Sequence, residues 1–120
     1  MRVCRLDGAR CKDDRYRVSK RLAFLEKVTS DGTDDPNAWY GLAMEYRKLE
    51  RWDEALEAFA TLRNKNPDYV AMYLMCGQLL EGVGRKNEAR EWLEAGILQA
   101  RAKGDSHALS ELQSALSSLD

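Results

Sequence analysis

The side chains best suited to chemistry are few in this sequence and lie far apart along it. There is one histidine, His107, and there are three cysteines, Cys4, Cys11 and Cys76. His107 falls in the first turn of a predicted helix, where an imidazole is more often a surface group than a general base. Cys4 and Cys11 lack the spacing and the histidine neighbours of a zinc site, and an odd cysteine count without a secretory signal disfavours disulfides. Cys76 lies in an apolar helical pattern and is predicted to be a small core residue.

Carboxylates and aromatic residues are more numerous, but their spacing is not that of a catalytic centre. Four glutamates have the spacing of charged pairs on the outer face of a helix, namely Glu54, Glu57, Glu88 and Glu91. The three tryptophans fit a core or the edge of a hairpin rather than a ligand cage. The sequence contains no glycine-rich phosphate loop and no nucleophile elbow. It therefore predicts a protein that is not an enzyme and that binds no cofactor and no metal ion.

The composition indicates which elements position these residues. Of 120 residues, 44% are hydrophobic and 32% are charged, with only 8 glycines and 2 prolines. The abundant alanine, leucine, glutamate, arginine and lysine residues favour helices. No apolar run approaches the ~18 residues of a membrane-spanning helix, and the N-terminus lacks the apolar core of a signal peptide. We therefore expect one all-helical domain with no membrane contact and a cytoplasmic location.

Positive charge is concentrated near the N-terminus. Residues 1–21 carry eight Lys and Arg against three Asp and Glu, whereas the rest of the chain carries eleven against seventeen. This asymmetry predicts a basic, flexible tail over residues 1–14. Such a tail can contact nucleic acid, but Tyr16 is its only aromatic neighbour, so base stacking has little support and nucleic acid is not an expected partner. The sequence leaves open whether residues 1–14 are functional, disordered or a mis-assigned start.

A repeat becomes visible when the sequence is shifted by 34 residues. Residues 51–57, Arg-Trp-Asp-Glu-Ala-Leu-Glu, then align with residues 85–91, Arg-Lys-Asn-Glu-Ala-Arg-Glu, and four of the seven are identical. The same shift aligns the large residue Trp39 with the large residue Tyr73. A period of this length is typical of stacked helical repeats.

Apolar residues with helical spacing divide the chain into predicted helices. Most of these helices pair into antiparallel hairpins, and small residues such as Ala43 and Ala55 stand where the paired backbones must approach closely. The last stretch has a continuous apolar stripe and resembles a terminal helix that covers the end of a repeat stack. The predicted domain, residues 15–120, contains a leading helix over 15–29, a first hairpin over 36–66, a second hairpin over 67–103 and a capping helix over 105–119.

Capping residues mark where these helices should begin and end. Each hairpin is predicted to start with a capping residue followed by a proline, Asp35-Pro36 in the first and Asn66-Pro67 in the second. Gly104 suits a left-handed C-terminal cap for the second hairpin. Asp105 can then cap the last helix.

The residue types and their spacing resemble the tetratricopeptide repeat (TPR) family. In the first hairpin the pattern Trp-x2-Leu-Ala-x2-Tyr, followed by Ala-x3-Phe and a proline, is similar to the family signature, and the second hairpin carries a degenerate copy. The signature residues are Trp39, Leu42, Ala43, Tyr46, Ala55, Phe59 and Pro67 in the first copy, and Tyr73, Gly77, Leu80, Ala89 and Leu93 in the second. The chain resembles in particular short bacterial TPR proteins of unknown function that end in a helix after a Lys-Gly-Asp turn, here residues 103–105.

The resemblance implies both a fold and a function. The fold is an all-α solenoid of antiparallel helix-turn-helix repeats with a C-terminal capping helix. The function is that of a protein-interaction adaptor or scaffold, which binds a peptide or helix of a partner in a concave groove lined by the first helix of each hairpin. The groove residues that the resemblance implies are Asn37, Tyr40, Met44, Arg47 and Lys48 in the first hairpin, and Ala71, Leu74, Gln78 and Glu81 in the second.

Two further inferences qualify this function. The family's clamp for chaperone C-terminal carboxylates needs lysine and asparagine at positions that hold Tyr40, Met44 and Met75 here, so a chaperone-tail adaptor is not expected. Two repeats are also fewer than the three or more that such stacks usually need. The alternative function is therefore a self-associating structural module that forms a homodimer through its apolar edges.

Overall fold

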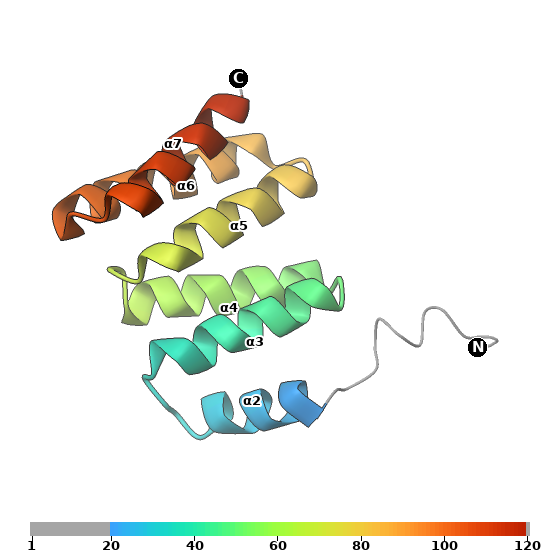
Figure 1. Cartoon of the computed structure of the whole chain (residues 1–120). Helices are drawn as coiled ribbons and strands as arrows, with labels where there is room; N and C mark the ends of the chain where they lie inside the picture. The colour runs from blue at the N-terminus through green and yellow to red at the C-terminus, as the bar shows by residue number, and fades with distance from the viewer. Residues whose placement is uncertain (1–19, 120) are drawn as a thin grey trace. The chain divides into compact units, whose positions relative to one another are not determined.

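Helices make up nearly all of the part of the chain that the structure describes. This computed structural model describes residues 20–119, so the prediction for the tail over residues 1–14 lies outside that range. Among residues 20–119, six helices follow one another with no strand between them (Figure 1). They are α2 (Lys20–Ser30), α3 (Pro36–Lys48), α4 (Trp52–Lys65), α5 (Val70–Gly82), α6 (Lys86–Lys103) and α7 (Ser106–Ser118). The all-helical fold class predicted from the sequence is confirmed.

The chain forms two compact units, and the division between them falls inside α4. The N-terminal unit ends at Thr61 and the C-terminal unit begins at Leu62. The N-terminal unit contains α2, α3 and most of α4, whereas the C-terminal unit contains the end of α4 together with α5, α6 and α7. The expected single domain over residues 15–120 stays a prediction.

Two helices begin with the capping residues that the sequence predicts. At the start of α3, Asp35 Oδ1 accepts a hydrogen bond from the Asn37 amide (3.0 Å), and Pro36 is the first helical residue. At the start of α7, Asp105 Oδ1 accepts a hydrogen bond from the Ala108 amide (3.0 Å). A carboxylate at this position satisfies amides that have no partner within the helix.

The start of α5 differs from the sequence prediction. The pair Asn66-Pro67 predicts a helix that begins at the proline, but α5 begins at Val70. Residues 66–69 instead form a turn, which is closed by a hydrogen bond from the Tyr69 amide to the Asn66 carbonyl (3.1 Å). The Pro67 carbonyl accepts a hydrogen bond from the Tyr73 hydroxyl. Proline is also favoured at the second position of a turn, so here it starts a turn rather than a helix.

The turn inside each hairpin has the same backbone pattern. Its last residue, Arg51 in the first hairpin and Arg85 in the second, donates its amide hydrogen to the carbonyl five residues earlier, over 2.9 and 2.8 Å. Such a bond ends a helix when the residue that precedes the donor adopts a left-handed conformation. That residue is Glu50 in the first hairpin (φ 62°) and Gly84 in the second (φ 86°). The 34-residue period therefore extends to the backbone.

In the N-terminal unit, α2 packs against α3 (Figure 1). The buried side of α2 includes Leu25. Polar side chains join the two helices as well, because Arg21 Nε lies 3.1 Å from Glu45 Oε1, and the Tyr46 hydroxyl donates a hydrogen bond to Glu26 Oε2 (2.5 Å). The contact between α2 and α3 is thus part apolar and part polar.

In the C-terminal unit, α6 packs against both α5 and α7. A Cβ atom placed on Gly96 of α6 would lie 2.5 Å from Tyr73 Cβ and 3.0 Å from Leu112 Cδ2. A Cβ atom on Gly77 of α5 would lie 2.7 Å from Leu93 Cδ2. Glycine at these two positions permits a helix approach that any side chain would obstruct. The helix α7 buries Leu112 against this pair and forms the predicted C-terminal cap.

Candidate binding surfaces

Most of the TPR signature residues lie in the interior and so build the scaffold. Trp39 is half-buried and Pro67 is exposed. The buried members are Leu42, Ala43, Tyr46, Ala55, Phe59, Tyr73, Gly77, Leu80, Ala89 and Leu93. A candidate binding surface must therefore be sought among the residues between them.

The two aromatic residues at the first signature position tie the start of each hairpin to the loop before it. Trp39 Nε1 donates a hydrogen bond to the Thr33 carbonyl (2.9 Å). One period later the Tyr73 hydroxyl donates a hydrogen bond to the Pro67 carbonyl. These bonds fix the approach of the chain to α3 and to α5, the two helices that carry the predicted groove residues.

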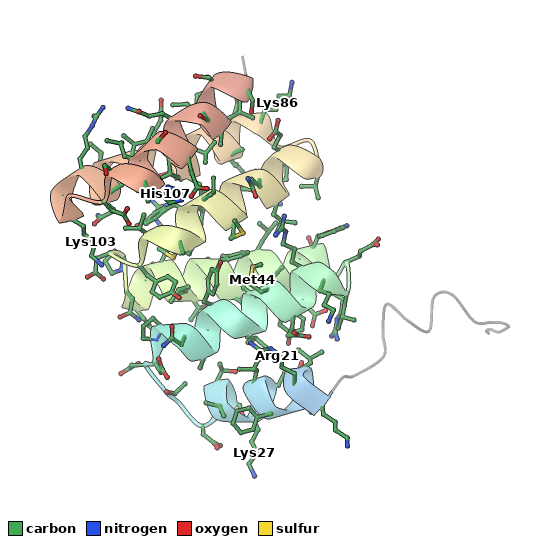
Figure 2. All side chains as sticks on the ribbon, viewed as in Figure 1. Arg21, Lys27, Met44, Lys86, Lys103 and His107 are labelled. Carbon is green, nitrogen blue, oxygen red and sulfur yellow. The ribbon has the colours of Figure 1, made fainter. Side chains whose placement is uncertain are left out.

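One pocket of the N-terminal unit is lined by groove residues that the sequence predicts. Met44, Arg47 and Lys48 of α3 surround it together with Trp52, the first residue of α4, and its volume is about 270 Å³. Figure 2 shows Met44 on α3. We call it the cationic pocket. Trp52 was not among the predicted groove residues, although a tryptophan that is 37% exposed beside two cations is a signal for a binding surface.

The other predicted groove residues lie in different surroundings. Asn37 is exposed on α3, and Tyr40 is half-buried, with its ring 6.4 Å from the Phe59 ring in an edge-to-face arrangement. The four predicted residues of the second hairpin lie on α5 in the C-terminal unit, namely Ala71, Leu74, Gln78 and Glu81. A role for them in a shared groove stays a prediction.

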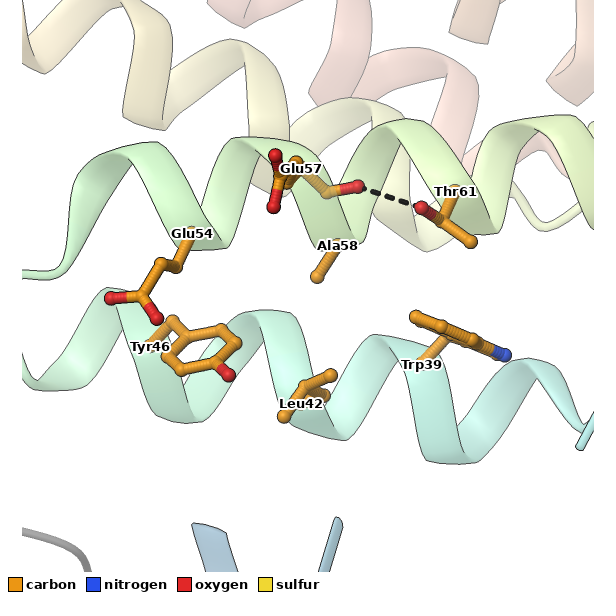
Figure 3. Close-up of a pocket in the computed structure, with 7 residues that line it drawn as sticks. All are labelled: Trp39, Leu42, Tyr46, Glu54, Glu57, Ala58 and Thr61. Carbon is orange, nitrogen blue, oxygen red and sulfur yellow. Dashed lines mark hydrogen bonds between the residues drawn. The ribbon is translucent and has the colours of Figure 1, made fainter. Parts of the chain in front are cut away.

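A second pocket of the N-terminal unit lies between α3 and α4 and has a volume of about 280 Å³. Residues of the two helices face each other across it (Figure 3). We call it the acidic pocket, because two carboxylates and no cationic side chain line it. Its lining consists of Trp39, Leu42 and Tyr46 of α3 with Glu54, Glu57, Ala58 and Thr61 of α4. The sequence assigned these glutamates to an outer face, because the spacing of a helix does not reveal a pocket against its neighbour.

An arginine forms the centre of a side-chain cluster in the C-terminal unit. The Arg63 guanidinium lies 4.6 Å from the centre of the Trp92 ring and 5.4 Å from that of Tyr73. Its two terminal nitrogens donate hydrogen bonds to the two carboxylate oxygens of Glu91, over 3.0 and 2.8 Å. The hydrogen bonds from Arg63 lower the pKa of the Glu91 carboxyl group. We call these four residues the arginine cluster.

The same ion pair joins the residue before α4 to its first turn and, one period later, the residue before α6 to its first turn. Arg51 holds Glu54 through two hydrogen bonds of 2.6 and 2.7 Å, and Arg85 holds Glu88 through two bonds of the same lengths. The Arg51 guanidinium also lies 4.9 Å from the centre of the Tyr46 ring. The negative charge of Glu54 in the acidic pocket is thus largely neutralised, and that of Glu57 is the more available.

Cys76 and His107, the cysteine and the histidine among residues 20–119, line neither the cationic nor the acidic pocket. Cys76 is buried, and burial raises the pKa of its thiol to about 12, which keeps it protonated at neutral pH. The His107 side chain is 87% exposed on α7, with Nε2 3.5 Å from Glu111 Oε1. Among residues 20–119, no group of three His, Cys, Asp or Glu side chains could hold a metal ion. None of the helices described is long and apolar enough to cross a membrane.

Helix-turn-helix units with one 34-residue period define a helical repeat protein. The tetratricopeptide repeat family matches residues 46–116, more than half of the chain. The chain therefore belongs to the tetratricopeptide repeat family. Its fold is generally a module for protein–protein interaction, and proteins of this family are generally non-catalytic scaffolds.

Similar proteins come from several bacteria. A TPR repeat-containing protein of Pseudomonas aeruginosa is 28% identical over 96 residues, which cover 80% of this chain and 91% of that protein. The crystal structure of a TPR domain protein from Salinibacter ruber is 38% identical with a TM-score of 0.67, over 71% of this chain and 94% of that chain. The solution structure of a protein from Bordetella parapertussis is 29% identical with a TM-score of 0.72, over 84% and 88%. The predicted resemblance to bacterial TPR proteins is confirmed.

Proposed function

We propose that this chain is a non-catalytic adaptor that binds an acidic segment of a partner protein at the cationic pocket. The observation that carries the proposal is the convergence of Met44, Arg47 and Lys48 with Trp52 around one pocket of about 270 Å³. Three of these four residues are groove residues that the resemblance to TPR proteins implies.

The chemistry of the pocket favours a carboxylate next to an apolar side chain. Arg47 and Lys48 attract negative charge, but an exposed ion pair contributes only about 0.2–1 kcal/mol. Trp52 and Met44 offer apolar surface, and buried tryptophan is the commonest kind of residue to dominate binding energy. The two cations therefore determine the specificity for an acidic partner, while the tryptophan and the methionine supply most of the affinity.

The proposal extends along the first helix of each hairpin. Asn37 and Tyr40 precede the cationic pocket on α3 by one to two turns, so a bound peptide or helix can continue over them. One period later Leu74, Gln78 and Glu81 occupy positions on α5 equivalent to Tyr40, Met44 and Arg47.

A peptide selection tests this function. The full chain is used to select from a library of random displayed peptides, and the enriched peptides are synthesised and titrated by calorimetry. We expect acidic-apolar sequences that bind the double variant Arg47→Glu, Lys48→Glu about tenfold more weakly, since two weak ion pairs become repulsive. The matched control is Lys27→Glu, Lys86→Glu, which changes the net charge equally at two lysines outside the cationic pocket, both labelled in Figure 2. Enriched peptides without acidic residues, or equal binding to both variants, contradict the proposal.

Self-association is a second candidate function, favoured by large apolar side chains on the surface. Phe24 of α2 and Leu98 of α6 are each 66% exposed. A homodimer that covers one of them must lose stability when that residue becomes polar. Sedimentation of the full chain over a wide concentration range, compared with Phe24→Ser and Leu98→Ser, tests this candidate. A monomer at every concentration removes it and leaves the peptide-binding proposal intact.

A further inference from the structure

The acidic pocket of the N-terminal unit has a counterpart in the C-terminal unit, one period of 34 residues later. Trp39 corresponds to Tyr73, Glu57 corresponds to Glu91, and both pairs stand at the same place on the first and the second helix of their hairpins. Because the two hairpins share their period and their turn geometry, the contacts of a residue in the second hairpin indicate which groups the corresponding residue of the first hairpin can bind.

In the C-terminal unit this place is occupied by an arginine. Arg63 comes from the helix before the hairpin, and its guanidinium lies over the rings of Tyr73 and Trp92 while Glu91 binds it at both terminal nitrogens. A planar guanidinium against aromatic faces with a carboxylate at its edge uses both the flat face of the group and its paired N–H donors.

The N-terminal unit has counterparts of Tyr73 and Glu91 in Trp39 and Glu57, but it lacks counterparts of Arg63 and Trp92. The residue one period before Arg63 is Thr29, a short side chain whose hydroxyl donates a hydrogen bond to the Leu25 carbonyl of its own helix (2.9 Å). The residue one period before Trp92 is Ala58, which lines the pocket. Both substitutions remove volume, and Ala58, the smaller residue at the second position, lines the pocket of about 280 Å³.

We propose that the acidic pocket binds an arginine side chain carried by a segment of a partner protein. The guanidinium would pair with Glu57 as Arg63 pairs with Glu91, and it would lie against the ring of Trp39, the counterpart of Tyr73, which lines the pocket together with Glu57. The Leu42 and Ala58 side chains offer apolar contact to the aliphatic part of the arginine.

The size and charge of the pocket agree with this occupant. Pockets for small-molecule ligands usually have volumes of about 300–1,000 Å³, so this one, at about 280 Å³, suits one long side chain and its neighbours better than a free ligand. Because Arg51 already holds Glu54, Glu57 is the carboxylate that supplies charge complementarity. The site takes the opposite charge to the cationic pocket, so it is distinct from the proposed function and can fail independently of it.

The test uses two short peptides that differ only in charge. One is an acetylated, amidated pentapeptide with a central arginine flanked by leucines, and the other has citrulline, a neutral isostere, in its place. Binding to the full chain is followed by NMR through the indole N–H signal of Trp39. We expect the arginine peptide to bind about tenfold more tightly, since a hydrogen bond between two charged groups is stronger than one to a neutral group.

Variants locate the effect. Glu57→Gln should remove the tenfold preference for arginine, whereas Glu94→Gln, a matched loss of an exposed carboxylate on α6, should leave it unchanged. Ala58→Trp introduces the residue of the second hairpin and should block both peptides. Glu57→Gln changes no buried residue, so it remains informative if Ala58→Trp does not fold.

Three results overturn the proposal. Equal affinity for the arginine and citrulline peptides, or an unchanged preference in Glu57→Gln, removes the arginine site. The other source is an arginine from residues 1–19 of the chain itself, and a variant with glutamine in place of Arg2, Arg5, Arg10, Arg15 and Arg17 tests it. Tighter peptide binding by that variant than by the wild type assigns the pocket to the chain itself and overturns the assignment to a partner.

Discussion

The two units pack their helices in different ways although they derive from one repeat pattern. In the C-terminal unit Gly96 and Gly77 allow helices to approach so closely that an added Cβ atom would lie 2.5 to 2.7 Å from a neighbouring side chain. In the N-terminal unit the closest neighbours of a Cβ atom on Gly41 are the ends of Arg21 and Leu25, at 3.3 and 3.4 Å. Sensitivity to one methyl group is therefore expected to be greatest at Gly96, where the neighbouring atom is Tyr73 Cβ, whereas the neighbours of Gly41 are side-chain ends that can shift.

The largest expected effect compares alanine at these two glycines. In Gly96→Ala the new methyl group meets Tyr73 Cβ, which cannot move without its backbone, so overpacking costs about 1–3 kcal/mol. The ~1 kcal/mol that alanine gains over glycine in a helix interior does not offset the upper part of that range, and we expect net destabilisation. In Gly41→Ala the arginine and leucine ends can shift, and we expect neutral or slightly higher stability. Urea denaturation of both variants measures the difference, and equal midpoints would show that the units pack alike.

The second comparison concerns the two hairpin turns. Glu50 and Gly84 both adopt positive φ, but only glycine does so without a steric cost, which is about 1–2 kcal/mol for other residues. We expect Gly84→Ala to destabilise the protein by about that amount. We expect Glu50→Gly to stabilise it by only a few tenths to ~1 kcal/mol, because the greater freedom of glycine in the unfolded chain offsets part of the relieved strain. Thermal unfolding monitored by circular dichroism shows whether each variant is more or less stable than the wild type. Destabilisation by Glu50→Gly would mean that the Glu50 side chain contributes more than its backbone strain costs.

The third comparison exchanges the guanidinium of the arginine cluster for an ammonium. Arg63→Lys keeps the charge but loses the two parallel hydrogen bonds to Glu91 and the flat contact with Trp92, so we expect a loss of ~1 kcal/mol. The control is Arg101→Lys, an exposed residue of α6, which should change stability by less than ~0.5 kcal/mol. If chemical denaturation gives the same midpoint for both variants, the guanidinium is not specifically recognised in the cluster.

The success of sequence-based prediction depended on how local the cause of each feature is. Asp35 and Gly104 act within a few residues of their own helix ends, and their capping roles were predicted correctly. The start of α5 was predicted wrongly, because the hydrogen bond from Tyr73 holds the Pro67 carbonyl in a turn, and the Asn-Pro pattern itself suits both structures.

For the candidate sites too, residues close together along the chain were easier to predict than residues far apart. Met44, Arg47 and Lys48 of the cationic pocket were among the predicted groove residues, because they lie on one helix, and their binding role stays a prediction. The arginine cluster was not predicted, because its ion pair joins Arg63 to a glutamate 28 residues away. Spacing within a helix identifies residues that share a face, but it does not identify which residue of another helix meets that face.

The smallest expected effect is a pH dependence that separates Glu91 from the other carboxylates. Hydrogen bonds from Arg63 lower the pKa of Glu91 in the folded protein below the value of about 4.3 that glutamate has in an unfolded chain. A carboxyl group with a depressed folded pKa stabilises the fold above the unfolded value, and this contribution is lost as the pH falls through the folded pKa. Because the Glu91 side chain is 57% exposed, solvent screening keeps the contribution well under ~1 kcal/mol.

Urea denaturation between neutral pH and pH 3 measures this contribution. The stability of Glu91→Gln should fall less steeply below about pH 4.3 than that of the wild type, because glutamine has no proton to gain. Arg63→Gln should remove the same part of the pH dependence, since without the arginine nothing favours the charged form of Glu91 at this place. The double variant should then behave like either single variant, whereas additive effects would show that the two side chains act on stability separately.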